Sequence, residues 1–204
     1  PDEGVYNAVD DVAWTADGSH VIGASKDKTA RVWNAASGEL VATLRGHTDA
    51  VSKLALSKDG ALLATAGADG VTKLWSTSDW SLRATLRGHR DDVVSCAFAA
   101  DGARLFTSSS DSTLRSWSAD PTVYGGVRWT ATNAPYVSRY SPDDSRIASA
   151  TYDGRVEIRD ASTNELVRAW DAHPKDKSCH ALAWTPDGRQ LVSGSWEPIV
   201  RVWD

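Results

Sequence analysis

The sequence predicts an all-β protein built from repeated antiparallel sheets, and three observations support this fold class. Tryptophan residues return at a fixed interval of 42 residues, at Trp33, Trp75 and Trp117. Asp-Gly pairs typical of tight turns keep the same interval, as at Asp59-Gly60. Apolar residues alternate with a period of two rather than 3.6, which indicates strands and not helices. One repeating β unit therefore fills the chain.

Each unit contains four short strands separated by turns. In the second unit we expect these strands at 51–56, 61–66, 71–75 and 82–86. The segments between them read SKDG, GADG and STSDWS. Glycine accepts a positive φ without steric cost, and aspartate can bond its own backbone, so these segments are typical of tight turns. One unit is thus an antiparallel meander of four strands.

Five such units make up a single domain over 1–204, with approximate bounds 5–46, 47–88, 89–130, 131–172 and 173–204. A small sheet that is apolar on both faces cannot bury them alone and must stack on copies of itself, which gives radial repetition. The fifth unit stops at Asp204, directly after its third strand. We therefore expect the last sheet to lack its outer strand.

The chain resembles the WD-repeat β-propeller family over nearly its whole length. The residues that carry the match are Gly46-His47, Asp69 and Trp75, then Gly88-His89, Asp111 and Trp117, and the ending VRVWD. In both good units the Gly-His histidine precedes the turn aspartate by 22 residues. The resemblance implies a β-propeller of four-stranded blades, with these five as part of a larger, seven-bladed ring. A self-contained five-bladed ring is the alternative.

The resemblance also implies a structural role for the repeated histidines. In WD repeats the histidine bonds the turn aspartate and a strand hydroxyl, and that hydroxyl meets the tryptophan indole. The implied tetrads are His47, Thr65, Asp69 and Trp75, and His89, Thr107, Asp111 and Trp117. Such a network would pin each tight turn to the neighbouring strand.

A nucleophilic triad is the competing interpretation of these residue types. Against it, the set occurs twice in full, is tied each time to a tryptophan, and has no glycine-rich oxyanion loop or nucleophile elbow beside it. We expect no catalytic residues here.

The other units depart from the tetrad pattern. The first keeps only the turn aspartate and the tryptophan, and the fourth has Arg159 in place of tryptophan. The fifth keeps His173, Ser193 and Trp203 but has Glu197 at the turn. We expect these turns to be held mainly by packing.

Composition narrows the class of protein. The net charge is -5, and the 22 Lys and Arg residues are scattered, which argues against nucleic acid as a partner. No apolar run approaches the length of a membrane helix, and the start PDEGVYNAVDD is unlike a signal peptide. Two cysteines, Cys96 and Cys179, favour the cytoplasm or another reducing compartment. No motif for a metal or a cofactor is present.

The expected function is a non-catalytic protein-protein interaction scaffold, within a larger protein or a multi-subunit complex. In the family the top rim of the propeller faces partner proteins or peptides, and its positions here are Lys26, Asp92, Tyr136, Tyr152, His180 and Trp196. The aromatic members gather in units four and five, as hot spots do. Strand pairing at the open edge of the fifth blade is a further expectation. The alternatives are a propeller enzyme and a module that recognises a modified peptide or glycan.

Overall fold

The computed structural model describes residues 8–99, 101–119, 127–132, 135–175 and 177–204. Over these ranges the chain forms strands and turns, and no helix. The all-β fold class is confirmed.

The strands form five sheets in chain order, and every pairing between neighbouring strands is antiparallel. The first sheet holds β1 (Val9–Trp14), β2 (His20–Ser25), β3 (Ala30–Asn34) and β4 (Leu40–Leu44). The second holds β5 (Val51–Leu56), β6 (Leu62–Gly67), β7 (Val71–Ser76) and β8 (Leu82–Arg87). The third holds β9 (Val93–Phe98), β10 (Arg104–Ser109), β11 (Thr113–Ser118) and β12 (Val127–Thr132). The fourth holds β13 (Pro135–Tyr140), β14 (Arg146–Thr151), β15 (Arg155–Asp160) and β16 (Leu166–Asp171). The fifth holds β17 (Cys179–Trp184), β18 (Leu191–Ser195) and β19 (Val200–Trp203).

The turn between the first two strands of a sheet has one backbone geometry throughout the chain. Its glycine has a φ of 70° at Gly18 and 72° at Gly60, a region that side chains disfavour. In the fourth sheet Asp144 stands at this position with a φ of 58°, which aspartate tolerates better than most residues. The turn therefore requires a positive φ at this position, which explains why glycine recurs there and why aspartate can replace it.

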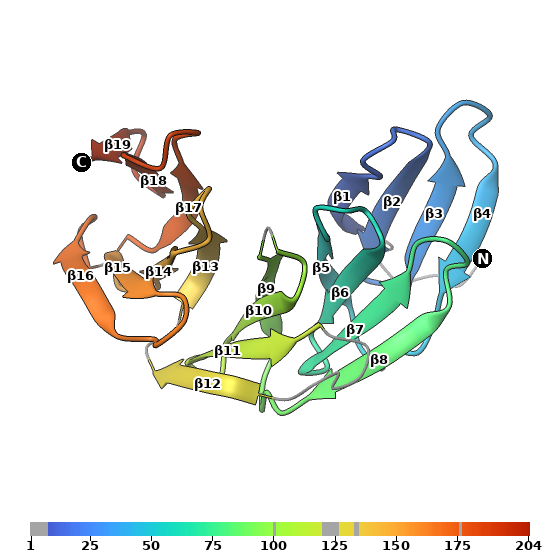
Figure 1. Ribbon diagram of the computed structural model, residues 1–204, viewed down its shortest axis with the longest axis horizontal. Helices are drawn as coiled ribbons and strands as arrows, with labels where there is room; N and C mark the ends of the chain where they lie inside the picture. The colour runs from blue at the N-terminus through green and yellow to red at the C-terminus, as the bar shows by residue number, and fades with distance from the viewer. Residues whose placement is uncertain (1–7, 100, 120–126, 133–134, 176) are drawn as a thin grey trace.

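The five sheets follow one another along an open arc (Figure 1). The first strand of each sheet lies on the inner side of the arc, and β4, β8, β12 and β16 lie on the outer side. Consecutive inner strands contact one another from β1 through β5, β9 and β13 to β17. Between consecutive sheets lies an apolar core, such as the one in which Leu74 and Leu86 pack against Val93, Leu105 and Trp117. Stacking thus buries faces that a lone sheet would expose.

The first and fifth sheets, at the two ends of the arc, each expose apolar side chains that a neighbouring sheet covers elsewhere. Val12 on β1 is 64% exposed, and Val202 on β19 is 58% exposed. Leu74, which occupies the repeat position of Val202 in the second sheet, is fully buried by the third sheet. In Figure 1 the first and fifth sheets do not meet. The number of blades in a closed ring stays a prediction.

Candidate functional site

The second sheet contains a continuous hydrogen-bonded relay. The indole Nε1 of Trp75 donates to Thr65 Oγ1 over 2.9 Å, and Thr65 Oγ1 lies 2.9 Å from His47 Nε2. The other ring nitrogen, Nδ1, lies 3.0 Å from Asp69 Oδ2. Asp69 also accepts the backbone N–H groups of Thr48 and Val71, at 2.8 and 3.1 Å. The relay therefore ties the β6–β7 turn to the segment that enters β5.

The third sheet repeats the relay with nearly the same distances. Trp117 Nε1 donates to Thr107 Oγ1 over 2.7 Å, and this oxygen lies 2.7 Å from His89 Nε2. His89 Nδ1 lies 3.0 Å from Asp111 Oδ2. Asp111 accepts the backbone N–H of Arg90 at 2.9 Å. Thr65 and Thr107 are each 1% exposed, so neither hydroxyl can reach a substrate in solution.

The chain of donors assigns one neutral tautomer to each histidine. Because the threonine oxygen accepts from the indole, its own hydrogen can be donated to Nε2, which leaves Nδ1–H to donate to the aspartate. Burial lowers the pKa of His47 and His89 from 6.5, in spite of the neighbouring carboxylates. Hydrogen bonds, from Thr113 foremost, lower the pKa of Asp111 to about 2, although burial acts to raise it. A neutral imidazole bonded to an ionised carboxylate is the expected state at neutral pH.

We expect the stability of the protein to fall as the pH falls below about 6.5. The folded histidines have a lower pKa than unfolded ones, so the unfolded chain binds protons first and acid favours it. The lowered pKa of Asp111 removes further stability between about pH 4 and pH 2. Urea denaturation at several pH values between 8 and 4 measures this. A free energy of unfolding that stays constant from pH 7.5 to pH 5 would contradict the assignment.

The fifth sheet forms the same relay with a glutamate, where the sequence led us to expect a turn held mainly by packing. His173 Nδ1 lies 3.0 Å from Glu197 Oε2, and His173 Nε2 lies 2.9 Å from Ser193 Oγ. Trp203 Nε1 donates to that same hydroxyl over 2.8 Å. Hydrogen bonds from Arg201 and His173 lower the pKa of Glu197 to about 2. The sequence did carry a signal for this relay, namely a carboxylate at the turn position. The structure shows that the longer glutamate side chain still reaches the histidine.

The fourth sheet replaces the relay with ion pairs, which we also did not foresee. Glu157 is buried, with its Oε2 3.0 Å from Arg159 NH2 and its Oε1 3.4 Å from Arg155 Nε. Ser149 Oγ bonds Ser138 Oγ at 3.0 Å instead of a histidine. Arg159, which stands at the tryptophan position, thus bonds a buried carboxylate.

The top rim is the end of the sheets that carries the β2–β3, β6–β7, β10–β11, β14–β15 and β18–β19 turns and the segments entering the inner strands. Trp196, in the β18–β19 turn, is 74% exposed, and its ring meets His180 edge to face with centroids 4.6 Å apart. Tyr152, in the β14–β15 turn, is 45% exposed. The side chain of Tyr136 lies outside the described residues.

The two charged candidates lie elsewhere on the top rim. Lys26, in the β2–β3 turn, has its Nζ 3.9 Å from Asp10 Oδ1 in the same sheet. Asp92 precedes β9, and its pKa is raised by burial and by the nearby carboxylates of Asp91 and Asp49. Of the six candidates, the aromatic ones and His180 belong to the fourth and fifth sheets, and the charged ones to the first and third.

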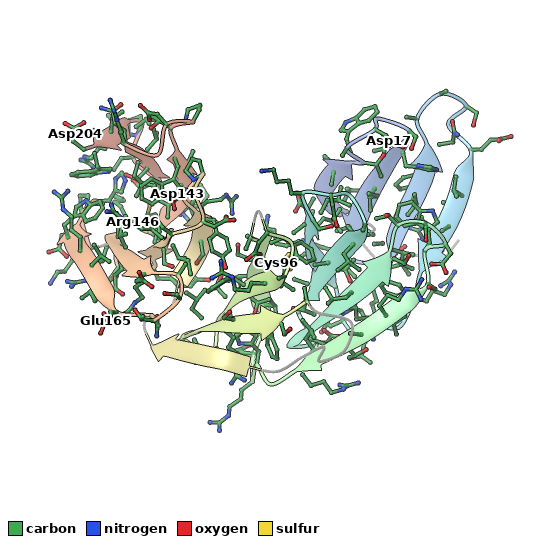
Figure 2. The ribbon with its side chains drawn as sticks, viewed as in Figure 1. Asp17, Cys96, Asp143, Arg146, Glu165 and Asp204 are labelled. Atoms are coloured by element: carbon green, nitrogen blue, oxygen red, sulfur yellow. The ribbon has the colours of Figure 1, made fainter. Side chains whose placement is uncertain are left out.

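A cavity of about 660 Å³ lies on the inner side of the arc, between the strands β1, β5, β9, β13 and β17. Asp92 and His180 lie on its wall, together with Lys53, Arg139 and Cys96. Figure 2 shows Cys96 near the middle of the arc, and burial raises the pKa of its thiol to about 12. Within the described part of the chain, no group of three or more His, Cys, Asp or Glu side chains is placed to hold a metal ion. The wall of the cavity thus includes residues of both the top rim and the inner strands.

Comparison with known families gives one match over almost the whole sequence. The family described as "IFT122 first beta-propeller" matches residues 8–204. This range includes all nineteen strands of the described structure.

Curated relatives match shorter parts of the chain. WD repeat-containing protein 1 of Gallus gallus is 41% identical over 69 residues, which is 32% of this chain and 11% of the relative. Actin-interacting protein 1 of Drosophila melanogaster is 40% identical over 65 residues, again 32% and 11%. Pre-rRNA-processing protein IPI3 of Mycosarcoma maydis is 35% identical over 63 residues, or 31% and 10%. These alignments cover about a tenth of the length of each relative.

Proposed function

Because the chain belongs to the WD-repeat β-propeller family, we propose that it is a non-catalytic scaffold whose top rim binds partner proteins or peptides. WD-repeat propellers generally bind other proteins, and the relatives' names include an actin-interacting protein and a pre-rRNA-processing protein. We place this scaffold within a larger protein or a multi-subunit complex.

The observation that carries the proposal is the pairing of His180 with Trp196. A tryptophan that is 74% exposed leaves most of its apolar surface in water, while the ring of His180 fixes it from one side. Rigid aromatic side chains bury a large area on binding and lose little conformational entropy. Tyr152, which is 45% exposed in the β14–β15 turn of the neighbouring sheet, is the second aromatic residue of the proposed rim, and Tyr136, Lys26 and Asp92 complete it.

Replacing Trp196 or Tyr152 with Ala is expected to weaken binding of partner proteins by about thirtyfold or more, since truncating a hot-spot aromatic side chain costs about 2 kcal/mol or more. Immobilised protein would first capture partners from an extract, and the affinity of each identified partner would then be measured by calorimetry with purified components.

Trp14→Ala is the matched control. Trp14 is 60% exposed on β1 and belongs to the opposite end of that strand from the top rim. This variant should bind every partner as the unaltered protein does. If Trp196→Ala and Tyr152→Ala both left the affinity for every partner unchanged, the proposed rim would be wrong.

Recognition of a modified peptide or a glycan would use the same Tyr152 and Trp196, whereas a propeller enzyme would need reactive groups in the inner cavity.

Among the described residues β19 pairs with β18 alone, and we propose that its other edge can pair with a strand of another chain.

We also propose a reducing intracellular compartment, which suits the unpaired Cys96 and Cys179. The described residues include no helix long and apolar enough to cross a membrane.

A further inference from the structure

A second hollow lies at the bottom rim, the end of the sheets that carries the β1–β2 and β5–β6 turns. It measures about 230 Å³ and lies between the first and second sheets. Figure 2 shows Asp17 at the β1–β2 turn, which forms one side of this hollow. The residues that line it and matter here are Asp17, Ser19, His20, Asp59, Thr77 and Trp80.

Trp80 holds an unfavourable backbone conformation to form one wall of the hollow. Its φ is 57°, in the left-handed region that bulky residues avoid. Gly38 and Asn164 occupy the same repeat position with φ values of 73° and 66°, and both residue types suit this region. The ring of Trp80 meets His20 edge to face with centroids 5.5 Å apart. An aromatic side chain therefore stands where the turn itself would favour glycine or asparagine.

The boundary between the third and fourth sheets shows what occupies the equivalent place there. Arg104 stands two repeat lengths of 42 residues after His20. Its Nε and NH2 each lie 3.2 Å from Asp101 Oδ2, and its NH1 donates to the carbonyl of Ala161 over 3.3 Å. The guanidinium also lies 5.9 Å from the centre of the Tyr140 ring. At this boundary the chain fills the position with its own guanidinium.

The boundary between the first and second sheets has side chains at the corresponding positions but no arginine to fill the space between them. Asp17 corresponds to Asp101 and Thr77 to Ala161 in the repeat, and Asp59 adds a second carboxylate. Hydrogen bonds from Thr15 and Ser19 lower the pKa of Asp17 to about 2, so it is ionised at neutral pH. Two carboxylates beside an aromatic ring attract a planar cation through ion pairing and cation–π contact.

We propose that this hollow binds the guanidinium of an arginine side chain supplied by a partner polypeptide, with Asp17 and Asp59 as anionic partners and Trp80 as the aromatic wall. This site lies at the opposite end of the strands from the top rim and is independent of the function proposed for that rim.

The test uses three probes: the peptide acetyl-Gly-Arg-Gly-amide, the same peptide with citrulline, and free L-arginine. Chemical-shift titration of the assigned Trp80 indole N–H reports binding at the hollow. We expect the arginine peptide to bind about tenfold more tightly than the uncharged citrulline peptide, because charge-assisted bonds are the stronger ones. Equal binding of these two peptides, or no binding of either, overturns the proposal. Tighter binding of free arginine than of the arginine peptide overturns the assignment to a polypeptide partner.

His20→Arg should abolish binding of the arginine peptide, because the new side chain would fill the hollow as Arg104 fills its own boundary. Its melting temperature should be at least that of the unaltered protein. Should this variant fail to fold, Trp80→Asn serves instead, since Asn164 already occupies that repeat position. It should also lose binding, which is measured by calorimetry in this variant because the Trp80 indole is absent. A folded variant of either kind that binds the peptide normally contradicts the proposal.

Asp17→Asn should weaken binding of the arginine peptide about tenfold while keeping the turn, because an amide oxygen can still accept from Ser19. Asp187→Asn is the matched control. Asp187 occupies the same turn position in the fifth sheet, where it bonds Thr185 and Arg189. The control should bind the peptide normally, and an equal loss in both variants would contradict a local role for Asp17.

Discussion

Replacing Trp117 with Ala is expected to lower the free energy of unfolding by about 3–5 kcal/mol. The side chain is 1% exposed and is among the largest fully buried side chains of the described residues. It packs in the core between the second and third sheets, and its indole donates to Thr107 over 2.7 Å. The substitution removes apolar contacts from both sheets and leaves the Thr107 hydroxyl without that donor. Urea denaturation followed by far-UV circular dichroism measures the loss.

Trp196→Ala is the control, because it removes a tryptophan that is not part of the core. Its side chain is 74% exposed, so its removal opens no cavity, and the free energy of unfolding should change by about 0.5 kcal/mol or less. Equal destabilisation by the two substitutions would show that Trp117 does not hold the sheets together.

Replacing Glu157 with Ala is expected to cost about 3 kcal/mol. The Glu157 side chain is 7% exposed and lies between the guanidinium groups of Arg155 and Arg159. Without the carboxylate, Arg159 loses its ion pair, and Arg155 keeps the exposed carboxylate of Asp171, with its NH1 3.9 Å from Asp171 Oδ1. Thermal and urea denaturation of the variant would measure the cost.

Glu165→Ala is the matched control for this substitution. Glu165 lies in the exposed segment between β15 and β16, so its loss should be nearly neutral. In the double variant Glu157→Ala, Arg159→Ala the stability should partly return relative to Glu157→Ala, because the guanidinium that lost its ion pair is removed as well. A double variant whose losses simply add would contradict coupling between the two side chains.

The strands of the second sheet could be predicted from the sequence to within one residue. In the second sheet we expected 61–66 and 71–75, and the structure has Leu62–Gly67 and Val71–Ser76. This agreement has a physical reason, because the turns need glycine or aspartate at fixed positions and the alternation of apolar residues fixes the strands between them.

The side-chain networks of the fourth and fifth units could not be predicted from the sequence. Whether Glu197 can replace an aspartate depends on where the longer side chain can reach, and residue type alone does not give this. Glu157 could not be foreseen as a buried ion because its neighbours Arg155 and Arg159 lie along a strand in which exposed charges would look the same. The hollow beside Trp80 joins two units, and a repeat pattern describes one unit at a time.

The apolar cores between consecutive sheets have a consequence for how the protein loses its structure. Within the described residues the three middle sheets each share two such cores, whereas the first and fifth share one. Cooperativity in this arrangement is a nearest-neighbour property, as in a one-dimensional chain of coupled units. A local defect is therefore transmitted only through the adjoining layer, and amide protons in the middle of the arc should outlast those of its flanks in hydrogen exchange.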